Sequence, residues 1–126
     1  MRTLIVWMLL ALTVLPALAD ARMPAGPVGI SNGFVNGNTY REWPDIAKQG
    51  YVMGVVDGIH LSPFWGAESK DVKPVQNCVV GMRSDQLQAI VDAYLNAQPA
   101  IWDETMHTSV YGALIEACKV RGKPLR

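Results

Sequence analysis

Hydrophobic residues recur at helical spacing in two segments of the second half of the chain. The first segment begins at Ser84, which suits a helix N-cap, and ends before Pro99. Its apolar positions are Leu87, Ile90, Val91, Tyr94 and Leu95. The second segment follows Asp103, which can cap a helix, and closes at Gly122 and Pro124. Its apolar positions are Met106, Val110, Ala113, Leu114 and Ala117. The pattern predicts two consecutive helices that form an antiparallel hairpin.

An earlier segment also has the signals of a helix. Residues 39–42, Thr-Tyr-Arg-Glu, fit a capping box, and Pro44 suits the first turn of a helix better than its interior. We therefore expect the main first helix to run from about Pro44 to His60. No segment alternates β-branched and polar residues over a useful length, so no strand is predicted. The expected fold is all-α, a small bundle of three to four helices.

Three glycines in this first helix are spaced by four residues. Gly50, Gly54 and Gly58 would share one face, and each costs about 1 kcal/mol relative to alanine in a helix interior. A face without side chains lets another backbone approach closely. We expect this face to pack tightly inside the domain, so that a leucine at position 54 would overpack it.

Residues 61–77 contain Pro63, Gly66 and Pro74 and are predicted to form a long irregular connection. Long loops in compact domains often bind partners, and Phe64 and Trp65 lie near the start of this one. These two aromatic residues are the candidate partner-binding site. The alternative is that both side chains fold back as a lid on the small core.

The N-terminus has the pattern of an export signal. Arg2 precedes an apolar run over residues 4–15, and small residues follow at Ala17 and Ala19. The run is shorter than the roughly 20 residues that a membrane span needs, so we predict a signal peptide over residues 1–19 and a periplasmic protein. A retained anchor is the alternative.

The rest of the chain divides by composition. The Gly- and Pro-rich residues 20–38 should form an irregular N-terminal arm, residues 39–120 the helical domain, and residues 121–126 a basic tail. The full chain has 11 basic and 11 acidic side chains, and removal of Arg2 with the signal leaves one excess acid. This balance does not favour nucleic-acid binding, and no membrane contact is expected after signal cleavage.

The two cysteines, Cys78 and Cys118, are expected to form a disulfide in an exported protein. They lie before the start and near the end of the predicted hairpin, where antiparallel helices bring the two ends together. The alternative is a nucleophilic cysteine with His60 or His107 as its base. The histidines show no metal-ligand spacing, and there is no GxSxG motif. We expect no enzyme activity, no cofactor and no metal.

An ordered set of residues over positions 34–118 also suggests a family. It comprises the segment Tyr51–Gly58 (YVMGVVDG), a loop to Cys78, then Gln86-Leu87, Val91, Tyr94-Leu95, Pro99, Val110, Ala113-Leu114 and a closing Cys118. This order resembles the Tai-type immunity proteins of type VI secretion amidases.

The resemblance implies a small helical periplasmic protein, commonly dimeric. Such a protein binds a cognate peptidoglycan amidase effector, delivered by neighbouring cells, and blocks its active site. The alternative function is that of a periplasmic stress or chaperone-like helical protein, a class that also uses small disulfide-bridged domains. A small exported enzyme comes third.

Overall fold

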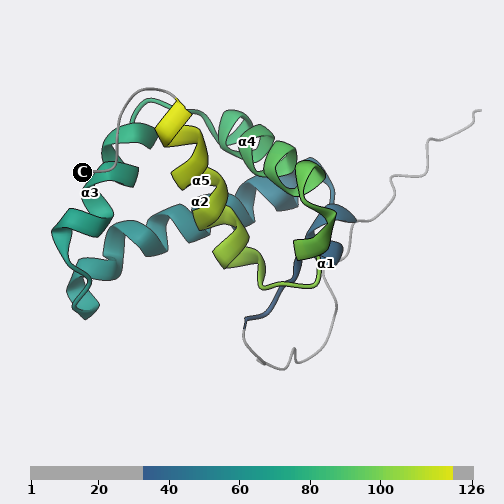
Figure 1. The fold of residues 1–126 in the computed structure, drawn as a ribbon, viewed down its shortest axis with the longest axis horizontal. Coiled ribbons are helices and arrows are strands. Elements are labelled where there is room, and N and C mark those ends of the chain that lie inside the picture. Colours follow the sequence, from purple (N-terminus) through teal and green to yellow (C-terminus); the bar gives the residue numbers. More distant parts are fainter. Residues whose placement is uncertain (1–32, 121–126) are drawn as a thin grey trace, which may run out of the picture.

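A computed structural model of the chain describes residues 33–120 (Figure 1). This part of the chain is helical and has no strand beyond one isolated bridge between Asn36 and Thr105. The elements, in order, are α1 (Gly37–Arg41), α2 (Asp45–Leu61), the short 3-10 helix η1 (Ser62–Trp65), α3 (Ser69–Val79), α4 (Ser84–Ala97), the short 3-10 helix η2 (Pro99–Ile101) and α5 (Met106–Val120). The expected all-α class is confirmed.

Part of the predicted organisation lies outside the described residues. The signal peptide over 1–19 and the basic tail over 121–126 belong there, together with positions 20–32 of the N-terminal arm. Over residues 33–120 no helix is long and apolar enough to cross a membrane.

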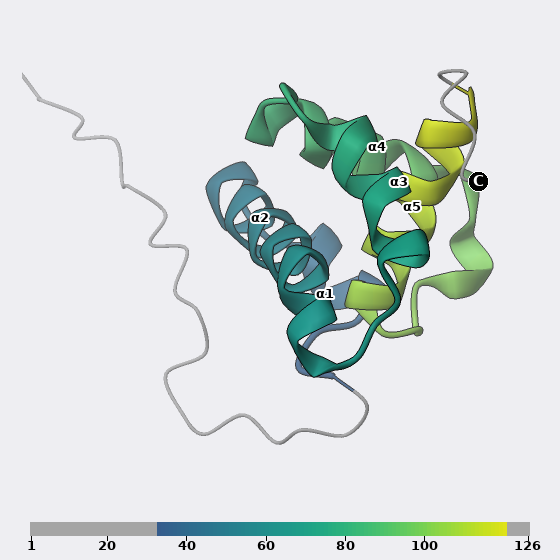
Figure 2. The same ribbon diagram turned by 90° about the vertical axis from the view of Figure 1, so that its left-hand side faces the viewer.

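The core is built from all five α-helices. Tyr40 of α1, Val52 of α2, Val75 of α3, Leu95 of α4 and Leu114 of α5 are all completely buried. Helix α2 forms one side of the bundle (Figure 2) and packs against α4, while α4 in turn packs against α5. Helix α5 also contacts α1, α2 and α3, so it is the helix around which the others are arranged.

The predicted main helices are present, but two of their caps differ from expectation. Helix α2 has nearly the predicted bounds. Ser84 is the first residue of α4 rather than its cap, and the Gln86 side chain accepts a hydrogen bond from the backbone N–H of Arg83, at 2.9 Å. Asp103 does not cap α5, because a hydrogen bond from the Met106 backbone N–H to the carbonyl of Val35, at 2.8 Å, fixes a later start.

The start of the helical domain also differs in detail. Residues 39–42 do not form a capping box, because Thr39 already lies inside α1. The cap is Asn36, whose side-chain oxygen accepts a hydrogen bond from the backbone N–H of Thr39 at 2.9 Å. Helix α1 therefore begins at Gly37, two residues before the expected start of the domain.

The long irregular connection predicted over residues 61–77 is wrong. The chain there forms η1 and then α3, which contains Pro74 in its interior. The proline removes one backbone donor, which would otherwise bond the carbonyl of Lys70. Burial offsets this loss, because the apolar face of α3 joins the core through Val72, Val75, Cys78 and Val79.

A polar network fixes how α2 and α4 pack. The buried Gln88 donates hydrogen bonds from its amide nitrogen to Asp45, at 2.8 Å, and to Asp92, at 3.2 Å. Its amide oxygen accepts a hydrogen bond from Gln49 at 3.0 Å. Lys48 lies 3.9 Å from the carboxylate of Asp92. Because a register shift would leave the buried amide of Gln88 unpaired, the network favours one alignment of the two helices.

Candidate functional site

The two aromatic residues of η1 form an exposed projection, here called the η1 tip (Phe64 and Trp65). Their side chains are 84% and 76% exposed, so the alternative that they cover the core is wrong. The tip lies at the end of the molecule opposite to α1 (Figure 1). Exposed neighbouring aromatic side chains of this size are uncommon unless they serve an interaction.

The local sequence explains why the chain turns at this point. The Ser62 hydroxyl donates a hydrogen bond to the carbonyl of Ile59 at 2.7 Å, and Pro63 presets the backbone angle of the first turn of η1. Gly66 then adopts a left-handed conformation with φ of +97°. A residue with a Cβ would be strained there, so Gly66 ends η1 and redirects the chain into α3.

Behind the tip lies an apolar cleft of about 450 Å³, here called the η1 cleft. Its walls come from the C-terminal half of α2, from η1, from the start of α3 and from the first turns of α5. The lining residues are Val55, Gly58, Ile59, Ser62, Ala67, Asp71, Val72, His107 and Tyr111. The cleft is lined by Ser62, the first residue of η1, and the tip consists of the last two residues of the same short helix.

Besides Ser62, whose hydroxyl bonds the carbonyl of Ile59, three polar side chains line this largely apolar cleft. Asp71 comes from the first turn of α3, and His107 and Tyr111 lie one turn apart on α5. None of the three side chains has a hydrogen-bond or ion-pair partner among residues 33–120. His107, the candidate base for a nucleophilic cysteine, lies in this cleft, and no cysteine lines the cleft.

The two cysteines form a disulfide with each other. Cys78 and Cys118 are bonded with an S–S distance of 2.06 Å, and no thiol in the described part of the chain is free. The predicted pairing is confirmed, and the alternative of a nucleophilic cysteine paired with His60 or His107 is wrong. The described residues also contain no cluster of His, Cys, Asp and Glu side chains that could hold a metal ion.

The glycine face of α2 is open rather than packed. A Cβ placed at Gly50, Gly54 or Gly58 would meet no atom within 4 Å, so the expectation of close packing inside the domain is wrong. The reason is that Val52 and Val56 turn the opposite side of α2 toward the core. Large apolar side chains are exposed next to the glycines. We call this surface the α2 outer face; it comprises Ile46, Gly50, Met53, Gly54 and Leu61.

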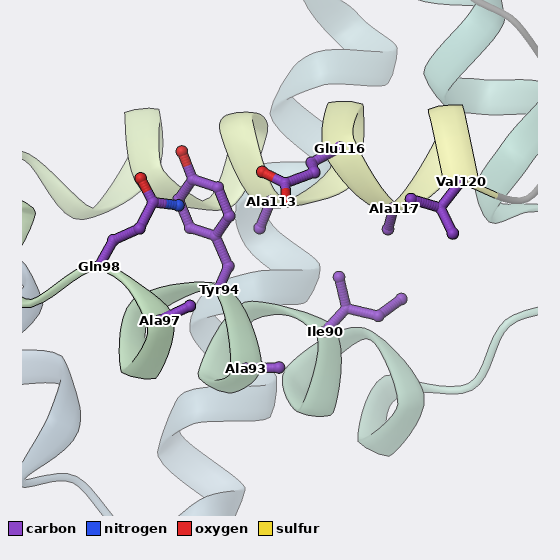
Figure 3. A pocket seen from close by; sticks show the side chains of 9 residues that line it. All are labelled: Ile90, Ala93, Tyr94, Ala97, Gln98, Ala113, Glu116, Ala117 and Val120. Carbon is purple, nitrogen blue, oxygen red and sulfur yellow. The ribbon is translucent and has the colours of Figure 1, made fainter.

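A second apolar groove, of about 420 Å³, runs between α4 and α5 (Figure 3). Figure 3 shows small side chains from both helices along it, with Tyr94 reaching from α4 toward α5. It is lined by Ile90, Ala93, Tyr94, Ala97, Gln98, Ala113, Glu116, Ala117 and Val120. Glu116 is its one acidic side chain, and Tyr94 and Gln98 are its other polar side chains.

Sequence reasoning found the tip but neither hollow. The α4–α5 groove had a visible signal, because alanines recur four residues apart in both helices, at positions 93 and 97 and at positions 113 and 117. The η1 cleft had none, since its polar side chains come from helices far apart in the sequence.

Comparison with known proteins gives one match. A family model described as Rap1a immunity proteins matches residues 36–118. This span runs from the cap of α1 to the second cysteine of the disulfide, and so covers almost all of the described fold. Neither the curated proteins nor the solved structures contain a significant match.

Proposed function

Because this chain belongs to the Rap1a immunity proteins, a family directed against type VI secretion effectors, we propose that it protects its cell by binding one cognate effector and inhibiting it. In this function the chain acts as a binding protein and catalyses no reaction. The η1 tip is the observation that carries the proposal, because it presents two large aromatic side chains on a helical scaffold.

The effector that we propose is a peptidoglycan amidase, as for the Tai-type immunity proteins that the sequence resembles. Support comes from the ordered residues between Tyr51 and Cys118 that carry this resemblance. Such an amidase acts in the periplasm, and the signal peptide over residues 1–19 would bring the chain there. The disulfide fits this compartment, since structural disulfides persist in oxidising surroundings.

The proposed mechanism is steric. Phe64 and Trp65 enter the substrate cleft of the amidase and exclude the peptide of the cell wall. Aromatic side chains are enriched at interface hot spots because they bury a large area with few rotatable bonds. The tip stays positioned because Ser62 and Gly66 fix the turn that carries it.

A homodimer is the second part of the proposal, and the α2 outer face is its interface. Exposed Ile46, Met53 and Leu61 supply apolar area, while Gly50 and Gly54 allow a second helix to approach closely. The interface would be isologous, with α2 of one copy against α2 of the other, as in most two-fold dimers.

The direct test is protection of a bacterial host. The proposed amidase effector is exported to the periplasm of the host, alone or together with this protein, and cell lysis is followed. We expect lysis by the amidase alone and survival with the full chain. A version lacking residues 1–19 should not protect, because it stays in the cytoplasm. Lysis despite a folded, exported partner would refute the proposal, and suppressed aggregation of unrelated proteins would favour the chaperone-like alternative.

A further inference from the structure

The η1 cleft combines apolar walls with one carboxylate that has no partner. Val55, Ile59 and Val72 supply the walls, and Asp71 lies among them. The neighbouring cation does not neutralise Asp71, because Lys70 pairs with Glu68 at 2.7 Å. A pocket of this kind takes a ligand with an apolar body and a few polar groups at fixed positions.

The negative charge of the cleft favours a positively charged ligand. Asp71 is its one carboxylate, and no lysine or arginine side chain lines it. Tyr111 and His107 add two aromatic rings, and the hydroxyl of Tyr111 can accept a further hydrogen bond. An arginine side chain matches all three features, since its methylene stem is apolar, its guanidinium is cationic and planar, and that plane stacks on aromatic rings.

We propose that the η1 cleft binds an arginine side chain presented by the partner protein, with Asp71 as its charge partner. This inference rests on the proposed function for the identity of that protein, which is the cognate effector. The proposed interface then has two parts, one that inserts into the effector and one that receives a side chain of the effector. The η1 tip enters the effector, and the η1 cleft directly behind it receives a side chain from the effector.

Arginine is preferred over lysine on geometric grounds. A guanidinium can form two parallel hydrogen bonds with one carboxylate, whereas an ammonium acts as a point charge and is more strongly hydrated. The cleft is open to solvent at Asp71, so the carboxylate stays hydrated until the ligand arrives. Desolvation by the arriving partner would strengthen the ion pair relative to an exposed one.

The first test uses the isolated full-length protein and a small probe. The 15N-labelled chain is titrated with Nα-acetyl-L-arginine amide and, separately, with the citrulline analogue, which has nearly the same shape but no charge. We expect arginine amide to shift the amide resonances of residues that line the cleft, and citrulline to shift them much less. Asp71→Asn should weaken the arginine effect at least fivefold. Equal responses to the two probes, or no response in the cleft, would overturn the inference.

The second test uses the effector and a matched control. Asp57 lies on α2 but outside the cleft, is exposed and has no ion-pair partner among the described residues. Asp71→Asn should weaken effector binding at least tenfold, and Asp57→Asn less than twofold. Because Asp71 also lies in the first turn of α3, where a carboxylate favours the helix, melting temperatures are measured for both variants.

The outcomes separate the two proposals. Tight binding of the effector by the wild type and by Asp71→Asn alike would overturn the arginine inference and leave the immunity function intact. Failure of the wild type to bind the effector would overturn the proposed function. In that case the arginine titration still decides whether the cleft has the stated preference.

Discussion

Cys78 and Cys118 join the last turns of α3 and α5, with their Cα atoms 5.8 Å apart. Helix α3 has Pro74 in its interior and makes fewer contacts with the bundle than α4 does, so the disulfide supplies attachment that packing alone does not. The bridge spans 40 positions of the sequence, a separation that includes the whole of α4.

Removal of this disulfide should strongly destabilise the fold. The loop-entropy estimate for a closed loop of this length is about 4 kcal/mol at 25 °C, before any strain is subtracted. We expect the Cys78→Ala, Cys118→Ala double variant to lose about 2–4 kcal/mol of unfolding free energy in urea denaturation. The reduced wild type is the control and should show a similar loss. A loss below about 0.5 kcal/mol would mean that α3 is held by packing alone.

Substitution by alanine should change the stability of the protein in opposite directions at two glycines, Gly37 and Gly54. A Cβ at Gly37 would lie 3.0 Å from the backbone Cα and carbonyl oxygen of Trp102, which cannot move without shifting the turn that carries them. Gly37→Ala should therefore destabilise the protein by more than about 1 kcal/mol. Gly54→Ala should stabilise it by about 0.5–1 kcal/mol, since nothing lies within 4 Å and alanine is the better helix former.

Urea denaturation of both glycine variants checks this pair. A stabilised Gly37→Ala would show that the backbone at Trp102 can move to accommodate the added Cβ without a cost in free energy. A destabilised Gly54→Ala would mean that this face is covered, either by the domain itself or by a second copy across the proposed dimer interface.

Tyr40 should make stability fall at high pH. Burial raises the pKa of its hydroxyl above the ordinary 10.0, and the charges of Asp92 and Asp45 act in the same direction. Above about pH 10 the unfolded chain loses the Tyr40 proton while the folded chain keeps it, so the folded state binds more protons. The free energy of unfolding therefore decreases as pH rises, by up to about 1.4 kcal/mol per pH unit from this group.

The measurement is urea denaturation between about pH 8 and pH 11 for the wild type and Tyr40→Phe. All other ionisable groups are the same in the two proteins, so the difference between the two curves isolates Tyr40. We expect the variant to lose less stability over the upper part of this range. Parallel curves would mean that Tyr40 ionises equally in both states.

The proposed dimer gives a prediction on the α2 outer face. Ile46→Glu with Leu61→Glu places two like charges on a surface that the core does not use. We expect the double variant to keep its helical circular dichroism spectrum and to elute as a monomer in light-scattering chromatography, where the wild type is a dimer. A wild type that stays monomeric at about 100 μM, or a double variant that still dimerises, would remove this face from the proposal.

The sequence predicted those parts of the fold in which one local signal dominates. Apolar residues at helical spacing identified α4 and α5, and the pair of cysteines in a chain with a predicted export signal identified the disulfide. The sequence does not predict α3, because Pro74 has the character of a helix breaker, although Val72, Val75 and Val79 have the spacing of a buried helical face. Tertiary burial outweighed the local cost of the proline.

The site was less predictable because its parts come from different helices. Phe64 and Trp65 were recognisable as adjacent aromatic residues, but whether they faced solvent or the core depended on the turn at Gly66. The η1 cleft brings Asp71 together with His107 and Tyr111, which lie more than thirty positions away. No local pattern marks such a contact, since it follows from how α3 and α5 pack.

The most direct test of the account is the affinity of this protein for the proposed amidase effector when the η1 tip is truncated. Isothermal titration compares the wild type, the Phe64→Ala, Trp65→Ala double variant and Val80→Ala, which removes an exposed apolar side chain at the end of α3. The double variant should lose at least about tenfold in affinity, roughly 1.4 kcal/mol, with an unchanged melting temperature. Val80→Ala should bind within about twofold of the wild type. Full affinity in a stable double variant would contradict the account, because the η1 tip would then play no part in the recognition of the effector.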